Sequence, residues 1–188
     1  EVTYDYDVLD RMTTITHRGN QQTSGPGQVR SFTYDEWGRL ASETTPEAGT
    51  VTYTYTSNDK VATSTSARGI TTTYTYNTRN LVTGISYSDG TTPSASFGYD
   101  DYGSRTSMTD GEGAMSYSFD SYRRLSSESR TFNGLSGNTY TYNYAYNISG
   151  QLTLANYVAP GFNKNINYAY NQIGAMTGMG TNIIGSDP

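Results

Sequence analysis

The residues of this chain that could take part in catalysis are few and scattered. His17 is the only histidine among 188 residues, and there is no cysteine. A Ser–His–Asp or Cys–His site needs a nucleophile beside a positioned base, and no Gly-x-Ser-x-Gly segment supplies one. His17 stands beside Arg18, Gly19 and Asn20, a polar stretch typical of a solvated loop. The sequence therefore predicts no catalytic residue and no enzyme.

Two acidic segments could contribute oxygen ligands to a cation. They are Asp100-Asp101 and Asp110-Gly111-Glu112-Gly113. Ca²⁺ is bound by carboxylate and backbone oxygens, and the second segment offers both. Its ligands are few, however, and the same residues make an ordinary hairpin turn that contains glycine. We therefore interpret the segment as a turn and expect neither a metal nor a cofactor.

These residues lie in a chain that is built from a repeated sequence motif. Its pattern is aromatic, any residue, aromatic, then Asp or Asn, two residues, a turn residue, and usually a basic residue and an aliphatic. The clearest copy runs from Phe32 to Leu40. The second aromatic of the eight copies falls at Tyr6, Tyr34, Tyr55, Tyr76, Tyr99, Phe119, Tyr146 and Tyr170. A period of this length indicates a repeat architecture in which each unit packs against its neighbours.

Each repeat unit is expected to be a β-hairpin. In residues 50–56, Val51, Tyr53 and Tyr55 alternate with threonines, which is the pattern of a strand with one covered face. A turn at 57–60, a return strand at 61–65, a second turn at 67–69 and another strand at 70–76 complete the unit. The fold class is therefore all-β, made of antiparallel hairpin repeats, and the tyrosines take the place of an aliphatic core.

The turn after the second aromatic has its own chemistry. Asp and Asn side chains can accept a backbone N–H two residues further on, and Gly tolerates a positive φ. The turn positions of these types are Asp7, Asp35, Gly38, Asn77, Asp100, Gly103, Asp120, Asn147, Gly150, Asn171 and Gly174. The pattern predicts a type I turn closed by a left-handed residue. Arg123 breaks the pattern and predicts local strain or a different turn.

Composition limits the possible partners. The net charge is −5 and no basic cluster stands out, so a nucleic-acid partner is not expected. No apolar run is long enough for a membrane-spanning helix. The first repeat begins at Tyr4 with no capping unit before it, which favours a fragment. We interpret residues 1–188 as a single array of about eight repeats from a longer protein, whose other repeats and cargo domain are its partners.

The motif resembles the YD repeat of Rhs proteins. The residues that carry the resemblance are the aromatic-x-aromatic-Asp-x-x-Gly-Arg-Leu of 32–40 and a glycine before the first aromatic, as at Gly49, Gly69 and Gly113. Similar repeats occur in the C component of bacterial insecticidal toxin complexes, in wall-associated bacterial proteins and in teneurins. The resemblance covers about residues 4–176 and implies a spiralling β-sheet shell or solenoid around a hollow interior, which in Rhs-like proteins encloses a toxic domain. Asp187-Pro188 is similar to the Asp-Pro of the segment that closes such a shell.

Strand spacing also favours a curved sheet. Eight repeats of two strands give roughly 16 strands, spaced about 4.8 Å apart. An open twisted sheet rarely exceeds ~10 strands before it curls. The sequence leaves open whether the tyrosine face or the threonine face lines the inside.

The tyrosines allow two interpretations. Rows of aromatics could stack on sugar rings, or they could pack on one another as a structural spine. Their fixed place in every repeat favours the spine. Tyrosines away from the repeat position are the better candidates for glycan contact, and these are Tyr87, Tyr102, Tyr122 and Tyr157.

Longer intervals between repeats are the other irregular places. Residues 17–30 and 132–138 are expected to be inserted loops and are candidates for partner contact. Asn147-Ile148-Ser149 matches a glycosylation acceptor but overlaps a repeat turn.

The sequence thus predicts a structural shell segment of a secreted or cell-surface bacterial protein. A carbohydrate-binding adhesin and a building block of an extracellular fibre or sheath are the alternatives, in which glycans or neighbouring copies would be the partners.

Overall fold

The computed structural model describes residues 1–19, 27–135 and 138–183. These residues form strands and turns without any helix, which confirms the all-β class. Every strand pair with a defined register is antiparallel. The chain divides into two compact units, Glu1–Pro93 and Ser94–Pro188.

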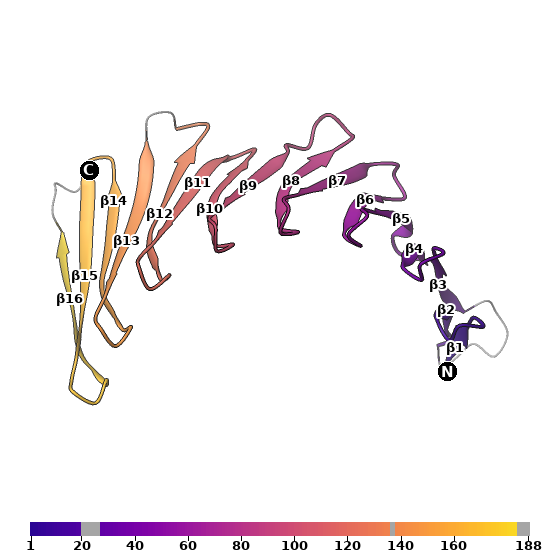
Figure 1. Ribbon diagram of the computed structural model, residues 1–188, viewed down its shortest axis with the longest axis horizontal. Coiled ribbons are helices and arrows are strands. Elements are labelled where there is room, and N and C mark those ends of the chain that lie inside the picture. Colours follow the sequence, from indigo (N-terminus) through magenta and orange to yellow (C-terminus); the bar gives the residue numbers. More distant parts are fainter. Residues whose placement is uncertain (20–26, 136–137, 184–188) are drawn as a thin grey trace. The chain divides into compact units, whose positions relative to one another are not determined.

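The strands of each unit follow one another in chain order (Figure 1). The first unit contains β1 (Val2–Tyr6), β2 (Met12–His17), β3 (Gln28–Tyr34), β4 (Leu40–Thr45), β5 (Gly49–Tyr55), β6 (Val61–Thr65), β7 (Thr71–Tyr76) and β8 (Val82–Tyr87). The second contains β9 (Ala95–Tyr99), β10 (Arg105–Asp110), β11 (Gly113–Phe119), β12 (Leu125–Phe132), β13 (Thr139–Tyr146), β14 (Leu152–Ala159), β15 (Phe162–Tyr170) and β16 (Met176–Ile183). Two strands per repeat, as expected from the spacing, account for this order.

Alternation along each strand separates two faces. In β5 the residues Val51, Tyr53 and Tyr55 are half-buried, and the threonines between them are exposed. On the threonine face, hydroxyls of paired strands hydrogen-bond across the sheet, as between Thr54 and Thr63 at 2.6 Å and between Thr44 and Thr50 at 2.8 Å. Cross-strand pairs of this kind stabilise the sheet from the side that faces water.

The tyrosine face is only partly covered. Among the described residues no hydrophobic side chain falls in the buried class, so the tyrosines form half-buried rows rather than the enclosed core that the sequence suggested. The repeat aromatics are half-buried from Tyr34 to Tyr170, whereas Tyr6 on β1 is 54% exposed. In this arrangement the stability of a hairpin comes from its contacts with the hairpins beside it.

The repeat turns share one backbone geometry. In the turn after Tyr34, Gly38 donates its N–H to the Asp35 carbonyl at 3.0 Å, and Asp35 donates to the Arg39 carbonyl at 2.8 Å. The closing residue has a positive φ in all eight turns: Asp10 (61°), Gly38 (82°), Asp59 (58°), Asn80 (60°), Gly103 (90°), Arg123 (64°), Gly150 (82°) and Gly174 (83°). The strand register shifts beside the second aromatic, as between Thr54 and Tyr55, which is the bulge expected after such a turn.

The turn at Arg123 distinguishes between the two expectations for this position, local strain and a different turn. Arg123 has a φ of 64° and donates its N–H to the Asp120 carbonyl at 2.9 Å, so its turn is the same as the others. The strain of a left-handed arginine remains, because its Cβ crowds the backbone in this conformation. The Arg123 guanidinium lies 4.4 Å from the centre of the Tyr102 ring and donates to the Ser104 hydroxyl at 3.0 Å, contacts that favour this backbone shape.

The inserted segments are shorter than expected. His17 is exposed, but it is the last residue of β2 and pairs with Val2 and Gln28. It is therefore a strand residue and not a loop residue, because the threonine–isoleucine alternation of β2 continues through it. In the second segment, Phe132 ends β12 and accepts a hydrogen bond from the Leu135 N–H at 3.1 Å. Residues 20–26 and 136–137, which fall in these segments, and Asp187-Pro188 lie outside the described residues.

Candidate functional site: the network of the repeat turns

The Asp or Asn of each motif organises its turn by hydrogen bonding. Asp35 Oδ1 accepts the backbone N–H of Trp37 at 3.0 Å and that of Arg39 at 2.8 Å. The side chains of Asp7, Asn77, Asp100, Asp120 and Asn171 accept the same two backbone N–H groups in their own turns. These side chains therefore occupy the backbone N–H groups that each turn leaves unpaired.

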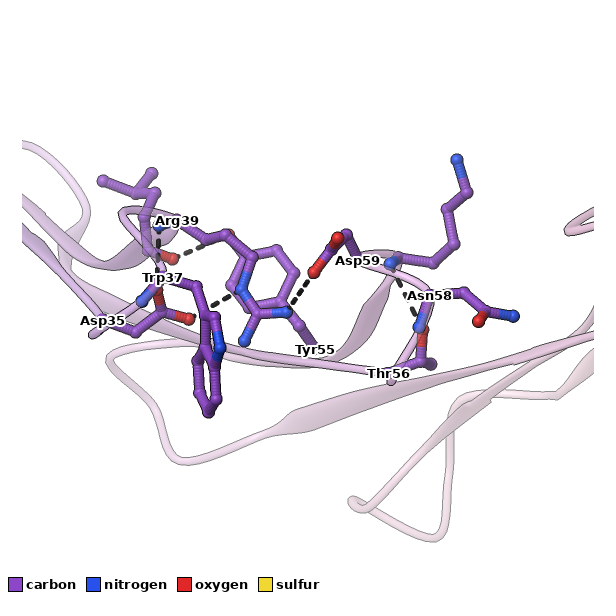
Figure 2. A network of polar contacts seen from close by, with 9 residues as sticks. Asp35, Trp37, Arg39, Tyr55, Thr56, Asn58 and Asp59 are labelled. Carbon is purple, nitrogen blue, oxygen red and sulfur yellow. Dashed lines mark hydrogen bonds and ion pairs between the residues drawn. The ribbon is translucent and has the colours of Figure 1, made fainter.

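The motif arginine connects one turn to the next repeat. Arg39 Nε donates to Asp35 Oδ2 at 2.7 Å, and its Nη1 donates to Asp59 Oδ1 at 2.6 Å. Its guanidinium carbon lies 4.8 Å from the centre of the Trp37 ring and 4.5 Å from that of Tyr55 (Figure 2). One cation thus joins a carboxylate and an aromatic ring of its own turn to the tyrosine and carboxylate of the following repeat.

The same arrangement recurs in both units. Arg11 binds Asp7 at 2.7 Å and lies 4.7 Å from the centre of the Tyr34 ring. Arg124 binds Asp120 at 2.7 Å and lies 4.5 Å from the centre of the Tyr146 ring. The sequence pattern contained this basic residue but did not show that it reaches the next repeat, since that contact depends on strand register.

The repeat tyrosines bind the hairpin that precedes them. In the five pairs that follow, the tyrosine hydroxyl donates to the backbone carbonyl of the first residue of the previous strand. The pairs are Tyr34 with Met12 (2.7 Å), Tyr55 with Leu40 (2.7 Å), Tyr76 with Val61 (2.8 Å), Tyr146 with Leu125 (2.9 Å) and Tyr170 with Leu152 (2.9 Å). The acceptor lies beside the register shift of its hairpin, where the bulge interrupts regular pairing. A phenylalanine at the repeat position, as at Phe119, cannot form this hydrogen bond.

Charge and hydrogen bonding shift the acid–base properties of the network. Burial raises the pKa of Asp35, but hydrogen bonds from the Arg39 backbone and guanidinium outweigh it, so this pKa lies below its usual value. For Asp7 the backbone hydrogen bond from Arg11 is the largest influence, and its pKa is also lowered. The hydrogen bond to Asp35 raises the pKa of Arg39. The pair therefore stays ionised, which suits a structural contact and not proton transfer.

One turn replaces the ion pair by a neutral one. Asn147 Nδ2 donates to Gln151 Oε1 at 2.8 Å, and Asn147 Oδ1 accepts the Gln151 backbone N–H at 2.9 Å. Gln151 Nε2 then donates to the carbonyl of Gly174, in the following turn, at 2.8 Å. The geometry of the network is thus kept without charge, so the connection between repeats is the shared feature.

The acidic segments take part in turns. Asp110 Oδ1 accepts the backbone N–H groups of Glu112 and Gly113 at 2.9 and 3.0 Å, and it lies 3.5 Å from Arg130. Across residues 1–19, 27–135 and 138–183, no group of three or more His, Cys, Asp or Glu side chains could hold a metal ion. Asn147-Ile148-Ser149 lies within a repeat turn.

The four tyrosines away from the repeat position lie in different surroundings. Tyr102 and Tyr122 project from turns with 73% and 77% of their surface exposed, and the guanidiniums of Arg123 and Arg124 cover their rings. Tyr87 is half-buried at the end of β8. Tyr157 is half-buried in β14, and its ring centre lies 4.8 Å from that of Tyr142. The structure therefore does not gather these four residues into one site.

Antiparallel hairpins joined by Asp-capped turns, arginine clamps and tyrosine hydroxyls define a β-hairpin repeat protein. Residues 18–50 and 34–70 match the family model described as RHS Repeat. Residues 18–70 therefore contain RHS repeats, the family to which the aromatic-x-aromatic-Asp-x-x-Gly-Arg-Leu motif pointed. Among curated proteins, none matches the sequence.

Solved structures of toxin complexes share this fold. The structure titled TcdB2-TccC3-Cdc42 has a TM-score of 0.69 and 17% identity, over 91% of this chain and 10% of that one. TcdB2-TccC3 without its hypervariable C-terminal region gives 0.70 and 16%, over 92% and 10%. A Photorhabdus luminescens Tc holotoxin pore gives 0.66 and 15%, over 95% and 12%. At these identities the likeness concerns the fold alone, and this chain spans about a tenth of the chains that it matches.

The described part of the chain holds no helix that is long and apolar enough to cross a bilayer.

Proposed function

We propose that this chain is a structural segment of a YD-repeat shell that encloses or presents a separate toxin or effector domain. The observation that carries the proposal is the use of the motif residues. Asp35, Arg39 and Tyr55 are all engaged in holding one hairpin to the next, and the same contacts recur in other repeats. Residues committed in this way are not available for catalysis, so we propose a scaffold and not an enzyme.

The similar structures support a shell with a cargo. One of them is TcdB2-TccC3 without its hypervariable C-terminal region, so that protein has a C-terminal region that this structure omits. We propose that the chain described here belongs to a longer protein of the same plan, with further repeats and a cargo domain, and that this protein is secreted or lies at a bacterial cell surface.

Protease protection in the full-length protein tests this proposal. The segment that follows the repeats should resist a soluble protease in the intact protein and should be digested when it is produced alone. A matched variant, Asp35→Ala with Arg39→Ala, should loosen the array and increase digestion of the cargo, whereas Ile148→Ala, at a fully exposed turn position, should not. Equal digestion of the segment with and without the repeats would show that nothing is enclosed.

In a second candidate function, a building block of a fibre, β1 and β16 would pair with neighbouring copies instead of with further repeats of the same protein. On β1, Val2, Tyr4 and Tyr6 are 45%, 53% and 54% exposed, and on β16 Met176 and Met179 are 61% and 66% exposed. Edge strands with apolar side chains can pair with another copy. Sedimentation of the full-length protein over a range of concentrations tests this alternative, because a fibre unit forms growing species and a shell protein remains monomeric.

A further inference from the structure

A hollow on the tyrosine face of the second unit is not explained by the repeat contacts. This open hollow has a volume of about 310 Å³ and lies over β11, β12, β13 and β14. Four aromatic rings line it together with two charged side chains: Phe132, Tyr140, Tyr142, Tyr157, Glu128 and Arg130. None of these six residues occupies the second-aromatic or turn positions of the motif.

Strand register brings these residues to one place. Glu128 pairs with Tyr142, and Tyr142 pairs with Tyr157, so a carboxylate and two rings form a row across three strands. Arg130 pairs with Tyr140 in the neighbouring row. Residues two apart on a strand point to the same face, so both rows belong to one surface.

The rings form a partly open apolar wall. The centres of Tyr142 and Tyr157 are 4.8 Å apart with their planes inclined by 34°, and Phe132 meets Tyr140 edge-on at 5.7 Å. Tyr142 remains 44% exposed, which is large for a ring in the middle of a sheet. A flat apolar surface is therefore accessible from solvent at this point.

The two charged side chains leave hydrogen-bonding capacity beside the rings. The Arg130 guanidinium lies 4.9 Å from the centre of the Phe132 ring and 3.5 Å from Asp110, and its Nε is buried without a partner. Glu128 Oε1 accepts the Tyr144 hydroxyl at 2.7 Å, which fixes the carboxylate. Burial and this carboxylate raise the pKa of Tyr144, so its hydroxyl remains a neutral donor. The hollow thus offers a held acceptor and an unused donor.

These properties select the chemistry of an occupant. A purely apolar group would remove Glu128 and Arg130 from water without hydrogen bonds, which is costly. A charged group would be repelled by one of the two. A sugar ring meets both requirements, because its C–H face packs on an aromatic ring and its hydroxyls both donate and accept. We propose that this hollow is a binding site for a neutral carbohydrate, with the ring on Tyr142 and Tyr157 and adjacent hydroxyls at Glu128 and Arg130.

The proposed carbohydrate site is additional to the structural role of the repeats. It also differs from the glycan contacts expected at the four tyrosines away from the repeat position. Of the tyrosines expected to contact a glycan, Tyr157 lies in the hollow, whereas Tyr102 and Tyr122 lie on turns beneath arginines. The dominant rings include Tyr142, which the sequence pattern did not distinguish from its neighbours in the run 139–146.

Saturation-transfer NMR and calorimetry with the whole chain test the proposal. The probes are neutral disaccharides that differ in linkage and sugar: maltose, cellobiose, lactose and chitobiose. At least one should bind. Tyr142→Ala should weaken that binding by about tenfold or more, through loss of the stacking surface. Tyr102→Ala, which removes an exposed tyrosine outside the hollow, should leave the affinity unchanged.

Two conservative variants protect the test against misfolding. Glu128→Gln keeps the size and an acceptor, and Arg130→Lys keeps the charge but removes Nε; each should weaken binding about fivefold or more, because a hydrogen bond to a charged group is lost. Binding that is indifferent to all three substitutions in the hollow would overturn the proposal. So would the absence of binding to every disaccharide, and so would binding of a hydrophobic peptide in their place.

Discussion

The hydroxyl of Tyr55 donates a 2.7 Å hydrogen bond to the backbone carbonyl of Leu40, the first residue of the strand that precedes its own. Arg39, next to Leu40 in sequence, lies 4.5 Å from the centre of the same tyrosine ring. The ring and the hydroxyl of one side chain therefore fix the position of one hairpin against another. Tyr34, Tyr76, Tyr146 and Tyr170 repeat the hydroxyl contact. The motif therefore recurs with the same period as the interfaces between successive hairpins.

Removal of this hydroxyl should destabilise the first unit with little other change. Tyr55→Phe keeps the ring under Arg39 and deletes the hydrogen bond to the Leu40 carbonyl, so the free energy of unfolding should fall by about 1 kcal/mol. Tyr102→Phe, at an exposed ring, should stay within about 0.5 kcal/mol of the parent. Urea unfolding followed by circular dichroism measures both.

Phe119 allows the reverse substitution, in which a hydroxyl is added. It occupies the repeat position in β11, and the equivalent acceptor is the carbonyl of Arg105, the first residue of β10. Phe119→Tyr should add the missing hydrogen bond and raise the free energy of unfolding of the second unit by up to about 1 kcal/mol. Destabilisation by this substitution, together with no effect of Tyr55→Phe, would contradict a structural role for the hydroxyl.

The protein should lose less stability when Asp35 and Arg39 are both replaced by neutral amides than the two single replacements predict. Asn147 and Gln151 already hold the same geometry without charge. Asp35→Asn alone removes one of the two carboxylates that bind Arg39, and Arg39→Gln alone leaves Asp35 without its ion, whereas the double variant restores complementary amides between residues 35 and 39. In a double-mutant cycle on the free energy of unfolding, the double variant should therefore lose less than the sum of the single losses. Strict additivity would mean that the two side chains do not interact.

The sequence was sufficient for the local structure of each repeat but not for the contacts between repeats. Alternation in 50–56 predicted β5, and the Asp and Gly positions predicted the turns, because both depend on residues that are close in the chain. The partners of Arg39 and of the Tyr55 hydroxyl depend on register, which a bulge shifts beside the second aromatic. The hollow combines Glu128, Tyr142 and Tyr157, residues of three strands outside the motif, and only strand pairing brings them together.

Acid should weaken the network through its aspartates. The pKa values of Asp7, Asp35, Asp100 and Asp120 lie below the ordinary 3.8, so the folded state binds these protons less readily than the unfolded chain. Their contribution to stability is therefore present above the unfolded value of 3.8 and is lost as the pH falls through the lower folded values. Urea unfolding should give a nearly constant free energy from about pH 7 to 5 and a decline below pH 4.

A variant identifies the groups responsible for this decline. Asp35→Asn removes one of the four carboxylates and should make the loss of stability at low pH shallower than in the parent. Glu36→Gln, at the neighbouring position of the same turn, should leave the slope as it is. An unchanged slope in Asp35→Asn would exclude this aspartate as a source of the acid dependence.

Alkaline titration should report the contact between Tyr53 and Glu43. Tyr53 donates its hydroxyl to Glu43 Oε1 at 2.7 Å, and this hydrogen bond, with burial, raises the pKa of Tyr53 to about 12. Because the folded value is raised, the contribution of this contact to stability is present below the unfolded pKa of 10 and is lost as the pH rises toward 12. Glu43→Gln should lower the pKa of Tyr53, followed by the ¹³Cζ shift in NMR, and should leave the raised pKa of Tyr144 unaffected.

Isolated repeats should not fold, because each hairpin is stabilised by its neighbours. Residues 50–76 hold one hairpin and the next strand, but the acceptor of the Tyr55 hydroxyl, the Leu40 carbonyl, and the Arg39 that covers its ring lie outside this segment. A peptide of residues 50–76 should therefore be largely disordered by circular dichroism, and extension of the peptide to 27–93, which adds β3, β4 and β8, should increase its β-signal more than in proportion to length. Tyr55→Ala and Tyr76→Ala in the longer peptide should reverse that gain, while Thr54→Ala on the exposed face should keep most of it. A stable β-structure in the short peptide would show that the hairpins are independent units and that the hydroxyl and arginine contacts between them are not what holds the array together.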